Sequence, residues 1–191
     1  MTRLPAAFRS ARAACLTGAA LAACALTPPL AADDAVAEPG PVVAAMKTAE
    51  GKEVGTITFV QTEHGVVVSV KVRDLSPGKH GLHIHAVGAC TPDFNAAGGH
   101  FNPAGSEHGF HAPGGYHAGD LPNLEVAADG TAEAEFFVPQ LTIAGPVSDK
   151  LPYTLSDADG SAMMIHAATD DYRTMASSGG RLACGVIVPK Q

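Results

Sequence analysis

Hydrophobic and polar side chains alternate along most of the chain after residue 41. In the segment 66–72 every second residue is valine, with Ser69 and Lys71 between the valines. The segment 132–138 alternates in the same way around two glutamates. A period of two is typical of antiparallel strands that bury one face and expose the other.

This pattern predicts eight strands. Turn-forming sequences such as Ser76-Pro77-Gly78 and Ala128-Asp129-Gly130 separate them. No segment has a convincing helical period. The predicted fold class is therefore all-β, an eight-stranded antiparallel sandwich or barrel. The strands are expected at 41–47, 52–61, 66–73, 80–87, 123–127, 131–138, 162–167 and 183–188.

Two longer segments interrupt the alternation, at 88–120 and at 168–181. The first is rich in glycine, proline and histidine, and the second is short and polar. Long loops inside a compact domain usually carry function or are disordered. Because the first loop contains His100, His108, His111, His117 and Asp120, we expect it to be functional and not disordered.

Residues 1–32 have the order of a secretory signal peptide. Three arginines and no acidic residue precede an alanine-rich apolar run at 13–26, and Ala31-Ala32 offers a cleavage site before Asp33. The run is shorter than the roughly 20 strongly apolar residues that a membrane-spanning helix needs. We therefore expect export, with residues 1–32 removed.

A second route of export is equally consistent with this segment. Leu21-Ala22-Ala23-Cys24 resembles the bacterial lipobox, which would leave Cys24 as a lipid-anchored N-terminus. The expected location is thus the periplasm, as a soluble protein or a lipoprotein. A flexible arm at 33–40 and one domain at 41–191 would follow.

The net charge of the mature chain limits the classes of molecule that it can bind. Loss of residues 1–32 would remove three of twelve basic residues and leave nine against nineteen acidic ones, a net charge of −10. Such a surface favours solubility, and phosphate contacts need clustered Lys and Arg. We expect no nucleic acid partner.

Cys90 and Cys184 are the cysteines that would remain after removal of the signal peptide. In an oxidising compartment, two cysteines are typical of one disulfide. A pair of buried free thiols is the alternative.

Nine histidines form the main chemical signal. His83 and His85 are two residues apart on an expected strand, so both imidazoles point to one face and can hold one metal ion. His166 lies among methionine and isoleucine, where burial of an imidazole is costly without a partner or a metal. A hydrogen-bonded core histidine is the alternative for His166.

The long loop adds His100, His108, His117 and Asp120. Three histidines and one carboxylate make a closed ligand set that suits structural, tetrahedral zinc. Imidazole also suits copper, and a redox metal needs an accessible site. Since seven ligands exceed the needs of one ion, two ions that share a ligand are the simplest arrangement.

Four motifs resemble the Cu/Zn superoxide dismutases of exported bacterial type. They occur in order over residues 41–188, at 80–85 (HGLHIH), 98–103 (GGHFNP), 119–122 (GDLP) and 180–187 (GRLACGVI). The resemblance implies a Greek-key sandwich or barrel of the immunoglobulin-like type with a long metal-binding loop. It implies copper on His83, His85, His100 and His166, and zinc on His100, His108, His117 and Asp120.

Further roles follow from the same resemblance. Asp170 corresponds to the aspartate that links ligands of the two metals, and Arg181 to the arginine over the copper channel. Cys90 and Cys184 correspond to the family disulfide. Arg181 and the bridging His100 are the expected catalytic residues. Three histidines are left without a metal. His64 lies in a turn and is expected in solvent, and His80 precedes the copper ligands and is expected at the surface. His111 has no place in the family pattern and is expected not to bind metal.

The implied activity is dismutation of superoxide anion to dioxygen and hydrogen peroxide by copper that cycles between Cu(II) and Cu(I). The alternative is a periplasmic copper/zinc buffer or delivery protein on the same fold. Loss of Arg181 or of a copper ligand would favour that alternative, and all are present. The oligomeric state, a homodimer included, stays open.

Overall fold

The computed structural model describes residues 40–191. The predictions on the signal peptide 1–32, on a lipid anchor at Cys24 and on the arm up to residue 39 therefore lie outside the described residues. Within residues 40–191, no helix is long and apolar enough to cross a membrane.

Eight antiparallel strands form one sheet, in the order β5-β4-β9-β10-β1-β2-β3-β6. Each overlaps one predicted strand, so the all-β prediction is confirmed. The strands are β1 Val42–Thr48, β2 Glu53–Thr62, β3 Gly65–Val72, β4 Gly78–His85, β5 Asp120–Val126, β6 Ala132–Pro139, β9 Ser161–His166 and β10 Arg181–Val188.

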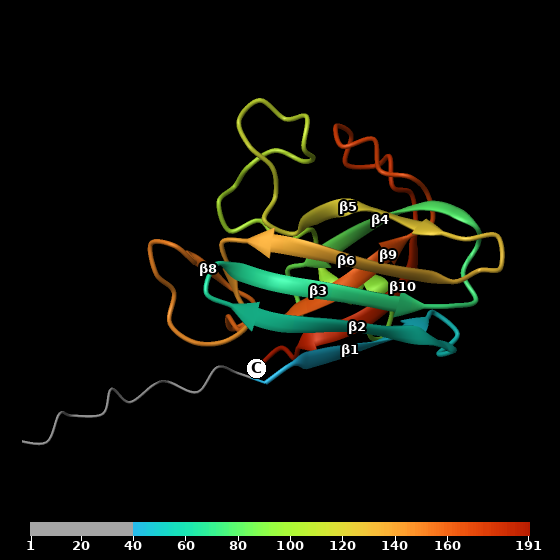
Figure 1. Cartoon of the computed structure of the whole chain (residues 1–191), viewed down its shortest axis with the longest axis horizontal. Coiled ribbons are helices and arrows are strands. Elements are labelled where there is room, and N and C mark those ends of the chain that lie inside the picture. The colour runs from blue at the N-terminus through green and yellow to red at the C-terminus, as the bar shows by residue number, and fades with distance from the viewer. Residues whose placement is uncertain (1–39) are drawn as a thin grey trace, which may run out of the picture. The chain divides into compact units, whose positions relative to one another are not determined.

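The sheet curls into a nearly closed barrel. Figure 1 shows β1, β2, β3 and β6 as the nearer layer and β4, β5, β9 and β10 behind it. The core lies between the layers, and the alternating valines of β3 are buried in it, Val66 and Val68 completely. The period of two therefore selects the buried face as predicted.

Several short elements were not predicted. A 3-10 turn, η1, occupies Phe94–Ala97, and a parallel pair joins β7 (Leu141–Thr142) to β8 (Tyr153–Thr154). Elements of two to four residues are too short to show a period.

The start of β5 also differs from the prediction, because the strand begins at Asp120 and not at 123. The observed strand includes Pro122, which cannot donate a backbone hydrogen bond. However, β5 is hydrogen-bonded on one side only, to β4, and an edge strand tolerates a proline. Asp120 is therefore a strand residue, paired with His83.

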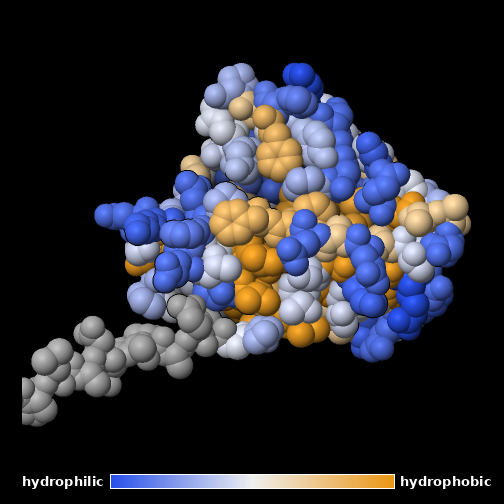
Figure 2. All heavy atoms as spheres, viewed as in Figure 1, coloured by the Kyte–Doolittle hydropathy of each residue, from blue (hydrophilic) through white to orange (hydrophobic). Residues whose placement is uncertain are grey.

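The outer face of the nearer layer is partly apolar. Val60 on β2 and Phe137 on β6 remain 39% and 54% exposed, and Figure 2 shows hydrophobic side chains gathered over this face. The end of β6 thus carries apolar side chains on both faces, unlike its start, where Glu133 is exposed.

Candidate metal centre

β4 brings His83 and His85 into the interior on one face. The strand is central, since it pairs with β5 and with β9. Both side chains are almost completely buried, at 0% and 1% exposure. Burial of two imidazoles requires that their ring nitrogens find partners.

These two histidines meet His100 and His166. One ring nitrogen from each of the four lies within 4.8 Å of the others, and all four residues are buried. His166 ends β9, and His100 forms an isolated β-bridge with His85. The structure thus brings together the four residues that the resemblance assigns to copper.

Hydrogen bonds orient three of these rings. His83 Nε2 lies 2.7 Å from Asp170 Oδ2, and the Nδ1 atoms of His85 and His166 lie 3.0 and 3.3 Å from the carbonyl oxygens of Gly98 and Gly179. Because these oxygens only accept, each of these nitrogens donates, and the other nitrogen of the ring is left for a ligand bond.

The second set contains His100, His108, His117 and Asp120. His117 Nδ1 lies 3.3 Å from His100 Nδ1 and 3.3 Å from Asp120 Oδ1, and His108 Nδ1 also lies 3.3 Å from Asp120 Oδ1. His100 Nδ1 is 2.8 Å from the same oxygen. These are the four residues that the resemblance assigns to zinc.

The donor atoms of the second set fit a tetrahedral ion. Bonds of about 2.0–2.1 Å around such an ion separate its donors by about 3.3–3.4 Å, close to most of the distances found here. In addition, the Nδ1 atoms of His83 and His108 are buried and form no hydrogen bond within residues 40–191, since the 3.3 Å contact of His108 with Asp120 lacks hydrogen-bond geometry. Each set thus contains one buried nitrogen that lacks a hydrogen bond, as expected for a metal-binding site, because the nitrogen could coordinate the metal ion.

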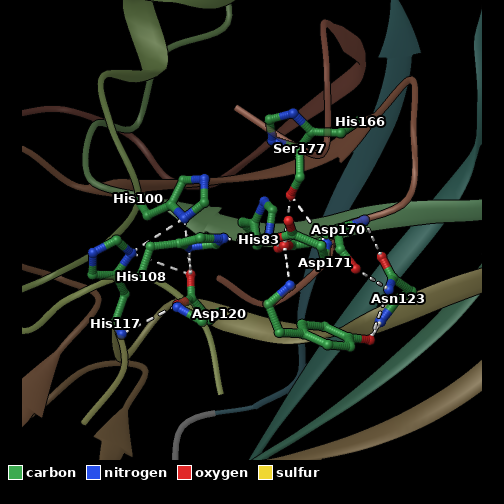
Figure 3. A network of polar contacts seen from close by, with 12 residues as sticks. His83, His100, His108, His117, Asp120, Asn123, His166, Asp170, Asp171 and Ser177 are labelled. Carbon is green, nitrogen blue, oxygen red and sulfur yellow. Dashed lines mark hydrogen bonds and ion pairs between the residues drawn. The ribbon is translucent and has the colours of Figure 1, made fainter. Parts of the chain in front are cut away.

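Asp170 connects the two sets (Figure 3). Its Oδ2 accepts from His83, and its Oδ1 lies 3.1 Å from His108 Nε2. The backbone N–H of Tyr172 and the hydroxyl of Ser177 also donate to Oδ1, at 2.8 and 3.1 Å. Asp170 therefore orients one histidine of each set.

The electrostatics favour neutral imidazoles and charged carboxylates. The pKa of His85 is lowered to about 2 and that of His166 to about 4, mainly by burial and also by nearby positive groups, Arg181 among them. Burial alone would raise the pKa of Asp120, but hydrogen bonds from His100 and from the Gly109 N–H outweigh it and lower the pKa to about 2. Metal binding requires these protonation states.

Arg181 begins β10 and is half-buried. Its guanidinium donates to the carbonyl oxygen of Phe94 and, at 2.6 Å, to that of Gly98. It also lines a hollow of about 440 Å³ with Phe94, Gly179 and Gly180. A fixed positive charge thus borders an open hollow near the first set of histidines.

The three histidines outside the two sets behave differently from one another. His64 and His111 are exposed, as expected. The prediction for His80 is wrong, because it is 2% exposed and lies inside β4. Its ring nitrogens lie 2.7 Å from the carbonyl oxygens of His166 and Ser76. The expected strand 80–87 had His80 as its first residue, whereas β4 begins two residues earlier, at Gly78, so His80 lies in the strand interior.

Cys90 and Cys184 form a disulfide across 94 positions of sequence. Cys184 lies in β10 and Cys90 in the long loop, so the bond attaches that loop to the sheet. The alternative of two free thiols does not hold in this structure.

Comparisons with known proteins agree with this geometry. Residues 53–187 match the family model for copper/zinc superoxide dismutase. The chain is 40% identical over 148 residues to a Cu-Zn superoxide dismutase of Caulobacter vibrioides, an alignment that covers 75% of this chain and 83% of the relative. It is 44% identical over 144 residues to a superoxide dismutase-like protein of Bacillus subtilis, covering 73% and 71%.

Solved structures show the same fold. A superoxide dismutase-like protein from Bacillus subtilis aligns with a TM-score of 0.69 at 41% identity, covering 76% of this chain and 97% of that one. The Cu/Zn superoxide dismutase from Brucella abortus aligns with a TM-score of 0.62 at 29% identity, covering 77% and 99%.

Proposed function

Because the chain belongs to the copper/zinc superoxide dismutase family, we propose that it dismutes superoxide at a copper and zinc centre shared by His100. The strongest support for this proposal is the arrangement of the buried metal-binding side chains. Two buried four-residue donor sets share His100, and Arg181 lies beside the set that contains His83, His85 and His166.

Copper would be held by His83, His85, His100 and His166, and zinc by His100, His108, His117 and Asp120. Copper supplies one-electron redox chemistry when bound, since it alternates between Cu(II) and Cu(I). The second set is a closed ligand set that suits a structural ion.

The side chains of this chain bind the anion and deliver the proton. Arg181 attracts superoxide into the hollow that it lines, against the negative charge of the whole protein. His100 directs Nδ1 toward Asp120, which leaves Nε2 on the side of the first set. A proton taken up by Nε2 during turnover would lie where superoxide is reduced to hydrogen peroxide. In balance, two superoxide anions and two protons give one dioxygen and one hydrogen peroxide.

The alternative function is a copper/zinc buffer or delivery protein. The similarity to a Bacillus subtilis protein that is named only as superoxide dismutase-like supports this alternative. Both functions need the same donor sets, but only the enzyme needs a positive charge at the hollow. Arg181 therefore favours the enzyme.

Metal analysis combined with an activity assay tests the proposal. The purified protein, reconstituted with both metals, should hold one copper and one zinc per chain and should dismute superoxide. The His83→Ala variant should lose copper and activity but keep zinc, because His83 is a member of the proposed copper set and not of the proposed zinc set. A protein that holds both metals without accelerating dismutation would support the buffer instead.

We also propose that residues 1–32 direct export, with lipid attachment at Cys24 as the alternative. The order of basic, apolar and small residues supports both. The mass of the mature N-terminus after expression in a Gram-negative host separates them. A chain that begins at Asp33 indicates a soluble periplasmic protein, and an acylated Cys24 a lipoprotein.

A further inference from the structure

Tyr172 joins three segments that are far apart in the sequence. Its hydroxyl accepts hydrogen bonds from the backbone N–H and the side-chain amide of Asn123, both at 2.8 Å. Its carbonyl oxygen accepts from the N–H of His111 at 3.2 Å. Its ring packs against Phe110, with 5.1 Å between the ring centroids. Tyr172 therefore holds the loop 168–181 against β5 and against the long loop.

Asn123 in turn holds the backbone of Asp170 on both sides. Its side-chain oxygen accepts from the Asp170 N–H at 2.9 Å, and its side-chain nitrogen donates to the Asp170 carbonyl oxygen at 2.9 Å. This two-point contact exists in one orientation of the amide, because an amide flip would place donor against donor. The Tyr172 hydroxyl accepts the second hydrogen of the same NH₂ group and so stabilises that orientation.

A β-bulge makes room for this contact. The register of β4 and β5 shifts between His80 and Leu82, opposite the part of β5 that contains Asn123. The Asn123 N–H bonds to Tyr172, and on the other strand the Gly81 N–H donates to the Ala168 carbonyl oxygen at 2.8 Å. Both strands thus use backbone groups at the bulge to bind the loop 168–181.

Gly81 is required for this close approach. A Cβ atom at Gly81 would lie 2.7 Å from Cβ of Ser178 and 3.5 Å from Cβ of Asp170. A side chain here would push the loop away from the sheet. The loop position is therefore set by packing at Gly81 and by hydrogen bonds at Asn123.

We propose that Tyr172 is a positioning residue, which keeps Asp170 where its two oxygens orient His83 and His108. The inference rests on the proposed two-metal centre and adds a residue to it. Tyr172 acts twice on Asp170: its N–H donates to Oδ1, and its hydroxyl stabilises the amide of Asn123 that grips the Asp170 backbone. Loss of the hydroxyl removes the partner that fixes the Asn123 amide, so Asp170 is held less rigidly and both histidine rings are oriented less strictly, although the Tyr172 N–H still donates to Oδ1.

The Tyr172→Phe variant tests this, with Tyr116→Phe as the matched control. Tyr116 belongs to the same aromatic cluster, 4.9 Å from Phe110 between centroids, but its hydroxyl makes no hydrogen bond to the described residues. Each variant thus loses one phenolic oxygen from the same cluster. Only Tyr172→Phe removes the hydrogen-bond acceptor of the Asn123 backbone N–H and side-chain amide.

Two measurements report on the metal-binding side chains. Zinc release to a chromogenic chelator should be about tenfold faster in Tyr172→Phe than in wild type, since outer partners of metal ligands typically contribute 10–100-fold to affinity. Cobalt(II) in place of zinc should give shifted visible absorption bands. Tyr116→Phe should match wild type in both. A Tyr172→Phe variant that melts lower but keeps the wild-type cobalt spectrum and zinc release overturns the inference.

The metal-free protein gives an independent readout. The Nε2–H protons of His83 and His108, held by Asp170, should be visible by proton NMR in wild type and in Tyr116→Phe. They should exchange faster with water in Tyr172→Phe, and unchanged exchange would overturn the inference. If wild type binds no zinc, the proposed metal centre fails, and this comparison still decides the role of Tyr172.

Discussion

Arg181 and His85 share one hydrogen-bond acceptor, the carbonyl oxygen of Gly98. Arg181 Nη2 donates to it at 2.6 Å and His85 Nδ1 at 3.0 Å. The guanidinium that is proposed to attract superoxide is therefore attached to the same backbone atom that orients a proposed copper ligand. The loop around Gly98 sets the position of both.

Replacing Arg181 by isoleucine should slow dismutation by about one to two orders of magnitude, because the anion loses a local positive charge. Copper content should stay near wild type, since His85 keeps its bond to Gly98. Arg181→Lys should recover only part of the rate, because lysine lacks the planar fork that reaches two carbonyl oxygens. The measurement is turnover at equal copper loading.

The control for Arg181 is Arg173→Ile, which removes an exposed positive charge from the neighbouring loop. Arg173 lines a different hollow, beside His111, so its loss should change the rate little. Equal turnover of Arg181→Ile and wild type would show that Arg181 is an ordinary strand-end charge.

Asp170→Asn should weaken zinc binding by about 10–100-fold. The amide keeps one acceptor oxygen, whereas His83 and His108 each need one, so one ring loses its partner. Competition with a chelator measures the affinity. Asp171→Asn is the matched control, since Asp171 is exposed and bonds only to its own loop. Similar losses in both variants would contradict a specific role for Asp170.

Reduction of the disulfide should lower the melting temperature by about 10 °C or more. The bond joins residues 94 positions apart, and a loop of that length corresponds to about 4–5 kcal/mol of stability in the chain-entropy model. About 2–4 °C per kcal/mol is expected for a domain of this size. The Cys90→Ala/Cys184→Ala double variant should melt like the reduced protein and should not respond to reductant. An unchanged melting curve after verified reduction would refute the expectation.

Acid should destabilise the metal-free protein. His85 and His166 have folded-state pKa values of about 2 and about 4, lowered mainly by burial from the usual 6.5. Below about pH 6.5 the unfolded chain binds protons that the folded protein excludes, so the free energy of unfolding falls as pH decreases from 7 toward 4. Melting temperatures at pH 7, 6 and 5 measure this.

His85→Gln should reduce that pH dependence but not abolish it, because His166 keeps its lowered pKa, whereas the same substitution at the exposed His64 should leave it as in wild type. A metal-free protein with a constant melting temperature between pH 7 and pH 5 would contradict the neutral, buried state of His85.

The sequence by itself determined the eight strands and the members of both donor sets. Strand alternation is local, since side chains two residues apart share a face whatever the rest of the chain does. His83 and His85 follow from that rule directly. His100 and Asp120 were predicted from short motifs of adjacent residues, 98–103 and 119–122. The remaining donors, His108, His117 and His166, were assigned through the resemblance to the family as a whole.

Apart from Asp170 and Arg181, which the resemblance implied, only the tertiary structure decided what lies around the donors. His80 was expected at the surface, yet it lies buried between two carbonyl oxygens. Tyr172 and Asn123 carried no signal in the sequence, because their contact joins residues 49 positions apart. That contact exists only where the register of β4 and β5 shifts and frees a backbone N–H. Such a shift depends on how strands pack, since side-chain period specifies which residues face inward but not how a loop returns to the sheet.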